Sequence, residues 1–163
     1  MYAMKRFFAA FILTLIAALL QGNAFGAQTG TTLVTFSFQA IDELSVTGAP
    51  TLTINSAVAG QQPQPVVDNS TAKYSISTNG INKRITASID TQMPANTTLE
   101  IKLGASGVGT STGYQTLSTT AMDVVTGISQ VAASNKMITY RFSATTAAGV
   151  LTRSCTVTLT LTD

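Results

Sequence analysis

The chain has 163 residues, with nine Lys and Arg, seven Asp and Glu, one Cys and no His. Without His it lacks the usual general base, the Ser–His and Cys–His nucleophile pairs and most zinc sites. Seven basic and seven acidic side chains follow residue 24, so there is no basic surface to attract nucleic acid. We therefore expect a non-catalytic protein with no catalytic residues, no cofactor, no metal and no nucleic-acid partner.

The first two dozen residues have the three-part plan of a secretory signal peptide. Lys5 and Arg6 precede an apolar run over residues 7–20, and small residues then permit cleavage after Ala24 or Gly26. As a helix the apolar run rises only about 21 Å, short of the ~30 Å hydrocarbon core of a bilayer. We expect removal of this leader, secretion to the cell surface or beyond, and no stable membrane insertion afterwards.

The predicted boundaries are therefore 1–24 for the signal peptide and 25–163 for one domain. About 139 residues are enough to bury a hydrophobic core. The core has to hold the fold unaided, because a single Cys cannot form an intramolecular disulfide.

Apolar and polar residues alternate along most of the predicted domain, which is typical of strands with one buried face. Thr is abundant and fits this pattern, because its β-branched side chain suits a pleated surface. The expected strands include 33–38, 41–46, 51–54, 73–78, 83–90, 98–103, 114–117, 124–128, 138–144 and 154–162.

Turn signals separate these strands. Residues 59–65 contain two Pro and a Gly, and residues 104–113 are rich in Gly, Ser and Thr. Asn79-Gly80 is a dipeptide typical of tight turns. Eight to ten short strands with frequent turns, and no helical period, predict an all-β fold: an antiparallel two-sheet sandwich, immunoglobulin-like or jelly-roll.

The last expected strand, 154–162, alternates Thr with four apolar residues, beginning with Cys155. This pattern predicts one apolar and one hydroxyl face, with Cys155 as a small buried hydrophobe. A thiol available for an intermolecular disulfide is the alternative. We expect a central or closing strand, with the opening strand 33–38 of the same molecule or of the next as its best partner.

Three blocks span most of the predicted domain: Val34 to Ile41, then Asn79-Gly80 with the strands up to Ile101, and finally Ile138 to Tyr140 with Val157 to Asp163. In style this pattern resembles secreted bacterial β-sandwich proteins that serve as subunits of surface fibres, pili or biofilm matrix. The resemblance implies a subunit that joins its neighbours by lending them a terminal strand.

The first functional hypothesis is accordingly a structural subunit that self-assembles into a surface filament, pilus or matrix. Val34, Phe36 and Phe38 share one face of the opening strand and are the candidate side chains to fill a neighbour's groove. The alternative for this strand is pairing within its own domain. The alternative function is a monomeric adhesin or glycan-binding module that uses loops 59–65 and 104–113. A glycan site usually displays an exposed aromatic platform, and the only aromatic residue at these loops is Tyr114, at one margin.

Overall fold

The computed structural model describes Gly26 and residues 28–163. The predicted signal peptide and its cleavage site at Ala24 lie outside the described residues. The chain divides into a segment that ends at Ser37 and a unit from Phe38 to Asp163. Among the described residues, no helix is long and apolar enough to cross a membrane.

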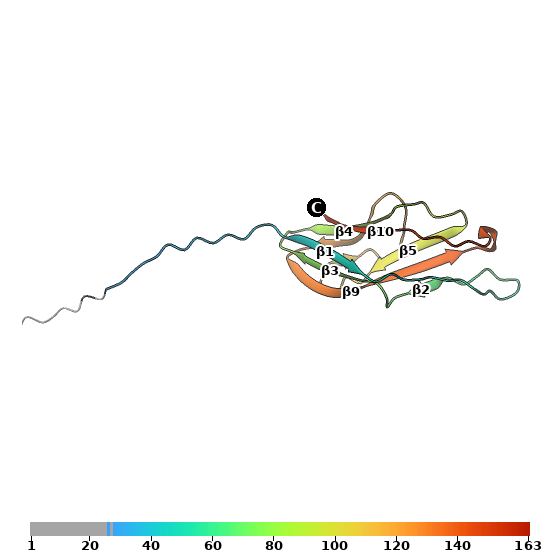
Figure 1. Ribbon diagram of the computed structural model, residues 1–163, viewed down its shortest axis with the longest axis horizontal. Coiled ribbons are helices and arrows are strands. Elements are labelled where there is room, and N and C mark those ends of the chain that lie inside the picture. The colour runs from blue at the N-terminus through green and yellow to red at the C-terminus, as the bar shows by residue number, and fades with distance from the viewer. Residues whose placement is uncertain (1–25, 27) are drawn as a thin grey trace, which may run out of the picture. The chain divides into compact units, whose positions relative to one another are not determined.

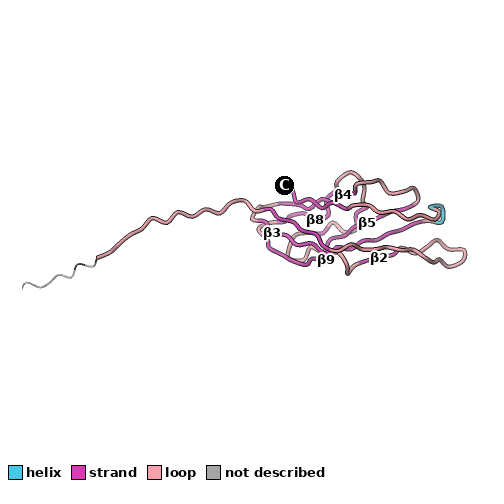
Figure 2. Tube along the Cα trace, in the orientation of Figure 1, coloured by secondary structure: helices cyan, strands magenta, loops and turns pink. Residues whose placement is uncertain are grey.

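The unit from Phe38 to Asp163 is built from strands that form two antiparallel sheets packed face to face, which confirms the predicted all-β sandwich (Figure 1). The connections are loops and a single 3₁₀ turn (Figure 2). The elements are β1 (Asp42–Thr47), β2 (Val66–Asp68), β3 (Lys73–Thr78), β4 (Lys83–Ile89), β5 (Thr97–Leu103), β6 (Thr110–Ser111), β7 (Gln115–Thr116), β8 (Met122–Ile128), β9 (Val131–Ala144), η1 (Thr146–Ala148) and β10 (Val157–Thr162).

The larger sheet has the order β1-β3-β9-β5-β7, and β2 also pairs with β9. The smaller sheet has the order β10-β4-β8-β6. β9 is the longest strand: its first half pairs with β3 and its second half with β5. β1 and β10 are therefore edge strands, one in each sheet, and they contact each other across the sandwich.

The apolar residues that alternate along the central strands form the hydrophobic core. The alternating apolar residues of the central strands are almost completely buried, because one face of each strand turns toward the opposite sheet. They include Tyr74 and Ile76 of β3, Ile85, Ala87 and Ile89 of β4, Leu99, Ile101 and Leu103 of β5, and Ile138 and Tyr140 of β9. The predicted apolar faces of these four strands are confirmed.

Two expectations for individual segments are wrong, and a third is only partly tested. Residues 33–38 are in no strand, and neither are residues 51–54, although Leu52 and Ile54 are half-buried. Within one molecule β10 pairs with β4 only, and its pairing with residues 33–38 of another copy stays a prediction. Local alternation indicates a two-faced strand, but the partner of that strand depends on the rest of the fold.

Candidate functional site: an exposed apolar segment and an open sandwich edge

Residues 33–38 carry large apolar side chains that face solvent. The exposed fractions are 92% for Leu33, 70% for Val34, 91% for Phe36 and 78% for Phe38. Residues 28–40 are all exposed, and no strand is assigned there. Four large exposed hydrophobes within six residues form an unusually apolar stretch of surface. The three candidate residues Val34, Phe36 and Phe38 are thus available to another molecule.

The sandwich leaves part of its own core uncovered at the edge formed by β1 and β10, which we call the open edge. On β10, Val157, Leu159 and Leu161 lie opposite buried residues of β4 and point inward with them. All three are nevertheless only half-buried, because no further strand lies beyond β10 in its sheet.

β1, the edge strand of the other sheet, also has inward-facing apolar side chains that stay partly exposed. Leu44 pairs with Ile76 and Val46 pairs with Tyr74, so both face the interior. The partners are 1–2% exposed, whereas Leu44 is half-buried and Val46 is 46% exposed. Inward-facing apolar side chains on both edge strands are therefore incompletely covered.

The opposite edge of the sandwich is closed. The loop predicted at residues 104–113 folds onto the core there, with Ala105 and Val108 buried. Leu117, just after β7, is 1% exposed, and its amide N–H donates to the carbonyl of Leu99. Two residues of this predicted ligand-binding loop therefore cover the core, and the two edges of the sandwich are not equivalent.

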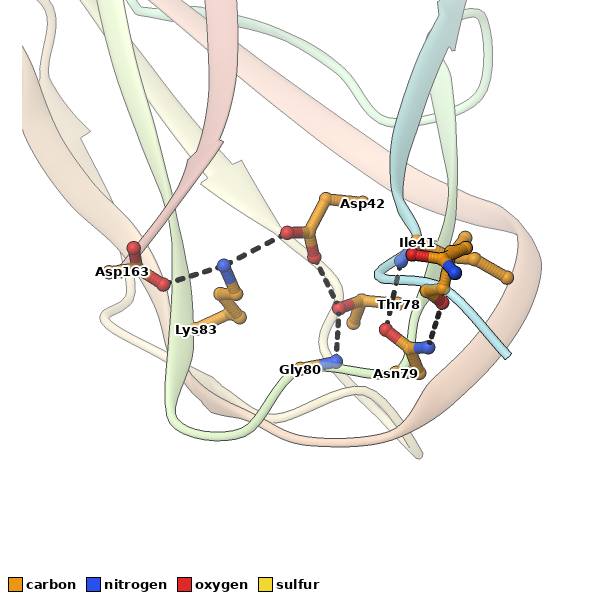
Figure 3. Close-up of polar contacts among 8 residues, drawn as sticks. Ile41, Asp42, Thr78, Asn79, Gly80, Lys83 and Asp163 are labelled. Carbon is orange, nitrogen blue, oxygen red and sulfur yellow. Dashed lines mark hydrogen bonds and ion pairs between the residues drawn. The ribbon is translucent and has the colours of Figure 1, made fainter. Parts of the chain in front are cut away.

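A polar cluster links the two sheets at one end of the open edge (Figure 3). Lys83 Nζ lies 2.9 Å from Asp42 Oδ2 and 2.6 Å from Asp163 Oδ1. The hydroxyl of Thr78 donates to Asp42 Oδ1 at 2.5 Å. The Thr78 hydrogen bond, and then Lys83, lower the pKa of Asp42, and Asp163, followed by Asp42, raises the pKa of Lys83.

The cluster gives the open edge one polar end and leaves the rest apolar. Asp42 opens β1, Lys83 opens β4, and Asp163 directly follows β10. Opposite charges at this distance favour the ionised forms of Asp42 and Lys83. Nothing in the sequence predicted this cluster, because its three charged residues are separated by 41 and 80 positions.

Asn79 makes a second polar connection next to this cluster. Its side-chain Oδ1 accepts the amide N–H of Ile41 at 2.9 Å, and its Nδ2 donates to the carbonyl of Gln39 at 2.7 Å. Its backbone N–H also donates to the carbonyl of Ile41 at 3.2 Å. The sequence indicated only a turn at Asn79-Gly80, and the contacts with Gln39 and Ile41 were missed.

Tyr114 is not a free aromatic platform. The guanidinium carbon of Arg141 lies 4.1 Å from the centre of its ring, and Lys102 Nζ lies 5.2 Å from it. Arg141 is held in turn by Glu100, with Nη2 donating to Oε1 at 2.7 Å. A cation stacked on an aromatic face stabilises the folded protein and occupies surface that a sugar ring would use.

Loop 59–65 carries little that would recognise a ligand. It is mostly exposed, and Gln62 Oε1 accepts the amide N–H of Thr146 at 2.9 Å. Within the described part of the chain, no three His, Cys, Asp or Glu side chains are grouped so that they could hold a metal ion.

Cys155 is half-buried and packs against the core next to the first residues of β10. The predicted place of this small side chain against the core is confirmed, but the side chain is half-buried rather than buried. Burial, and then the charge of Asp90, raise the pKa of its thiol. A raised pKa lowers the thiolate fraction and with it the reactivity of the sulfur at neutral pH.

Comparison with known proteins gives no match to a family model, to a curated protein or to a solved structure.

Proposed function

We propose that this protein is a non-catalytic, extracellular structural subunit that self-assembles into a surface filament, pilus or matrix. One copy lends residues 33–38 as a strand to the open edge of the next copy. The observation that carries the proposal is the exposure of Leu33, Val34, Phe36 and Phe38 on one short unpaired segment.

The chemistry of the segment and of the open edge match. An added strand gains main-chain hydrogen bonds from an unpaired sheet edge, and its alternate side chains fill a groove. Val34, Phe36 and Phe38 alternate with polar residues, as do Val157, Leu159 and Leu161 of β10. Both sets span four residue steps, or about 13 Å of strand.

Burial of the two surfaces against each other supplies the driving force. A large apolar side chain contributes about 1.5–3 kcal/mol when it is removed from water completely. Three such side chains from the lent strand would cover inward-facing residues that the sandwich leaves half-buried. Each copy then has one strand to lend and one edge to fill, which produces a head-to-tail chain rather than a closed pair.

Electron microscopy and light scattering of the purified secreted protein test this proposal. The wild type is expected to form fibres, and Phe36→Lys is expected to remain monomeric, because a charged side chain would be inserted into an apolar groove. Ser37→Lys is the matched control: its side chain alternates to the other face, so fibres should persist. Wild-type protein that stays monomeric at every concentration and in shed cell-surface material would overturn the proposal.

A further inference from the structure

The nearest competitor for the open edge is the protein's own preceding segment. Three residues, 39–41, separate Phe38 from the start of β1 at Asp42. Connections of two to five residues are the commonest in β-hairpins. A hairpin here would lay residues 33–38 along the free edge of their own β1. Because the segment is tethered, its effective concentration there would far exceed that of any second copy.

Asn79 forms hydrogen bonds with the chain at the residues where this reversal would occur. The carbonyl of Gln39 and the amide N–H of Ile41 project to the same side of an extended chain, where a neighbouring strand would pair with them. The side-chain amide of Asn79 takes the place of that neighbour, with hydrogen bonds of 2.7 Å to Gln39 and 2.9 Å to Ile41. Both bonds require residues 39–41 to stay extended, and a turn at these residues would break them.

The backbone on both sides of Asn79 is also held in place (Figure 3). The residues on either side of Asn79 are tied together, because Gly80 N–H donates to the hydroxyl of Thr78 at 2.9 Å. That hydroxyl donates onward to Asp42, the first residue of β1. The turn after β3 and the start of β1 therefore form one connected unit around the backbone of Ile41.

The sequence of residues 39–41 also disfavours a hairpin turn. Tight two-residue hairpin turns favour Gly, Asn or Asp at positions with positive φ. Residues 39–41 are Gln, Ala and Ile, and none of these adopts such a conformation readily. Turn residues that would help the chain reverse are thus missing where they would be needed.

We infer that Asn79 is a positioning residue: by clamping Gln39 and Ile41, it prevents residues 33–38 from capping their own open edge and reserves them for a second copy. This inference rests on the proposed function for its biological meaning. Its physical content, whether the segment pairs within one molecule, can be measured in the monomer.

Hydrogen–deuterium exchange of the amides of residues 33–38, measured over a range of protein concentrations, tests the inference. In the wild type, protection is expected to rise with concentration. In Asn79→Ala, two hydrogen bonds to the extended chain are lost, and protection is expected to be at least about tenfold greater than in dilute wild type and independent of concentration. Asn79→Asp, which keeps an acceptor for Ile41 but has no donor for Gln39, should lie between them.

Two further variants complete the experiment. Asn69→Ala removes an exposed Asn from another turn and should behave as the wild type. Gln39→Asn combined with Ala40→Gly leaves Asn79 in place and supplies turn residues, so it should also produce protection that is independent of concentration. This second route keeps the test valid if Asn79→Ala does not fold.

The outcomes separate the inference from the proposed function. If the Asn79 and turn variants exchange as the wild type does, the clamp inference is wrong, whether or not fibres form. If the variants gain protection that is independent of concentration while the wild type never gains any with concentration, the clamp stands and self-assembly fails. If dilute wild type is already protected, the segment pairs with its own domain and both ideas are overturned.

Discussion

Tyr74 illustrates how a single polar atom can connect distant parts of a β-sandwich. Its ring is 1% exposed, and its hydroxyl donates to the carbonyl of Gly104 at 2.8 Å. Gly104 begins the loop that closes one edge of the core, where its own N–H donates to the carbonyl of Met137. The hydroxyl of Tyr74 therefore helps to position that loop.

Tyr74→Phe should lower the free energy of unfolding by about 1–2 kcal/mol, because a buried hydrogen bond is lost and the Gly104 carbonyl loses a partner. Urea unfolding followed by circular dichroism measures the change. Tyr140→Phe is the matched control, since Tyr140 is also buried but its hydroxyl forms no hydrogen bond with the described part of the chain. Equal effects of the two substitutions would contradict this role of the Tyr74 hydroxyl.

β10 is the element whose role differs most from its appearance in the sequence. Its alternation of Thr with apolar residues suits a strand with one buried face, and the alternation is confirmed. Because β10 lies at the edge of its sheet, the apolar face is only half covered. Its free edge and its half-covered face together make it suitable to receive a strand.

Leu159→Lys should abolish the acceptance of a neighbour's strand while leaving residues 33–38 able to act as donor. The stability cost should be about 1–2 kcal/mol, because a half-buried apolar side chain is replaced by one whose charge can reach solvent. Thr160→Lys, on the exposed face of the same strand, is the control and should leave assembly intact.

A mixture of Leu159→Lys and Phe36→Lys makes the test sharper. Each variant alone should be monomeric, one without an acceptor edge and the other without a donor. Together they should form complexes of two copies that grow no further, as measured by analytical ultracentrifugation. Fibres formed by Leu159→Lys alone would place the acceptor elsewhere.

At the scale of the whole molecule, the ionisable groups predict a free energy of unfolding that stays nearly constant over a broad range of pH. On the acid side, the pKa of Asp42 is lowered chiefly by the Thr78 hydroxyl, and that of Asp90 by the backbone N–H of Thr156. Carboxylates with lowered pKa stabilise the fold above their unfolded value of 3.8, and this stabilisation is lost as the pH falls through their folded values.

On the alkaline side, burial raises the pKa of Tyr74 and Tyr140 from 10.0 to about 12. Unfolded chains would release these protons near pH 10, while the folded protein retains them to about pH 12, so alkali favours unfolding. The raised pKa of Lys83 changes stability in the same direction. Folding stabilises its charged form, and this stabilisation is lost as the pH rises through the pKa of the folded state.

The free energy of unfolding should therefore vary little between about pH 5 and 8, decline below about pH 4 and decline again above about pH 10. No His is present to titrate near neutrality. Urea titrations at a series of pH values measure this profile. A transition between pH 5 and 8 would contradict it and would require an ionisable group with a strongly shifted pKa.

Much of the architecture was predictable from the sequence, because strand formation depends on a two-residue period that can be read locally. The alternating residues of β3, β4, β5 and β9 marked both the strands and their buried faces. The same local pattern identified Val34, Phe36 and Phe38 as a set sharing one face.

Only the tertiary structure decided which of these faces are covered. Residues 33–38 and β10 have the same alternation as the central strands, but one is exposed and the other lies at an edge, since coverage depends on strand order. The Asn79 contacts and the Asp42–Lys83–Asp163 cluster likewise join positions that only the fold brings together. Periodicity is a property of neighbouring residues, whereas closure of a sandwich is a property of the whole chain.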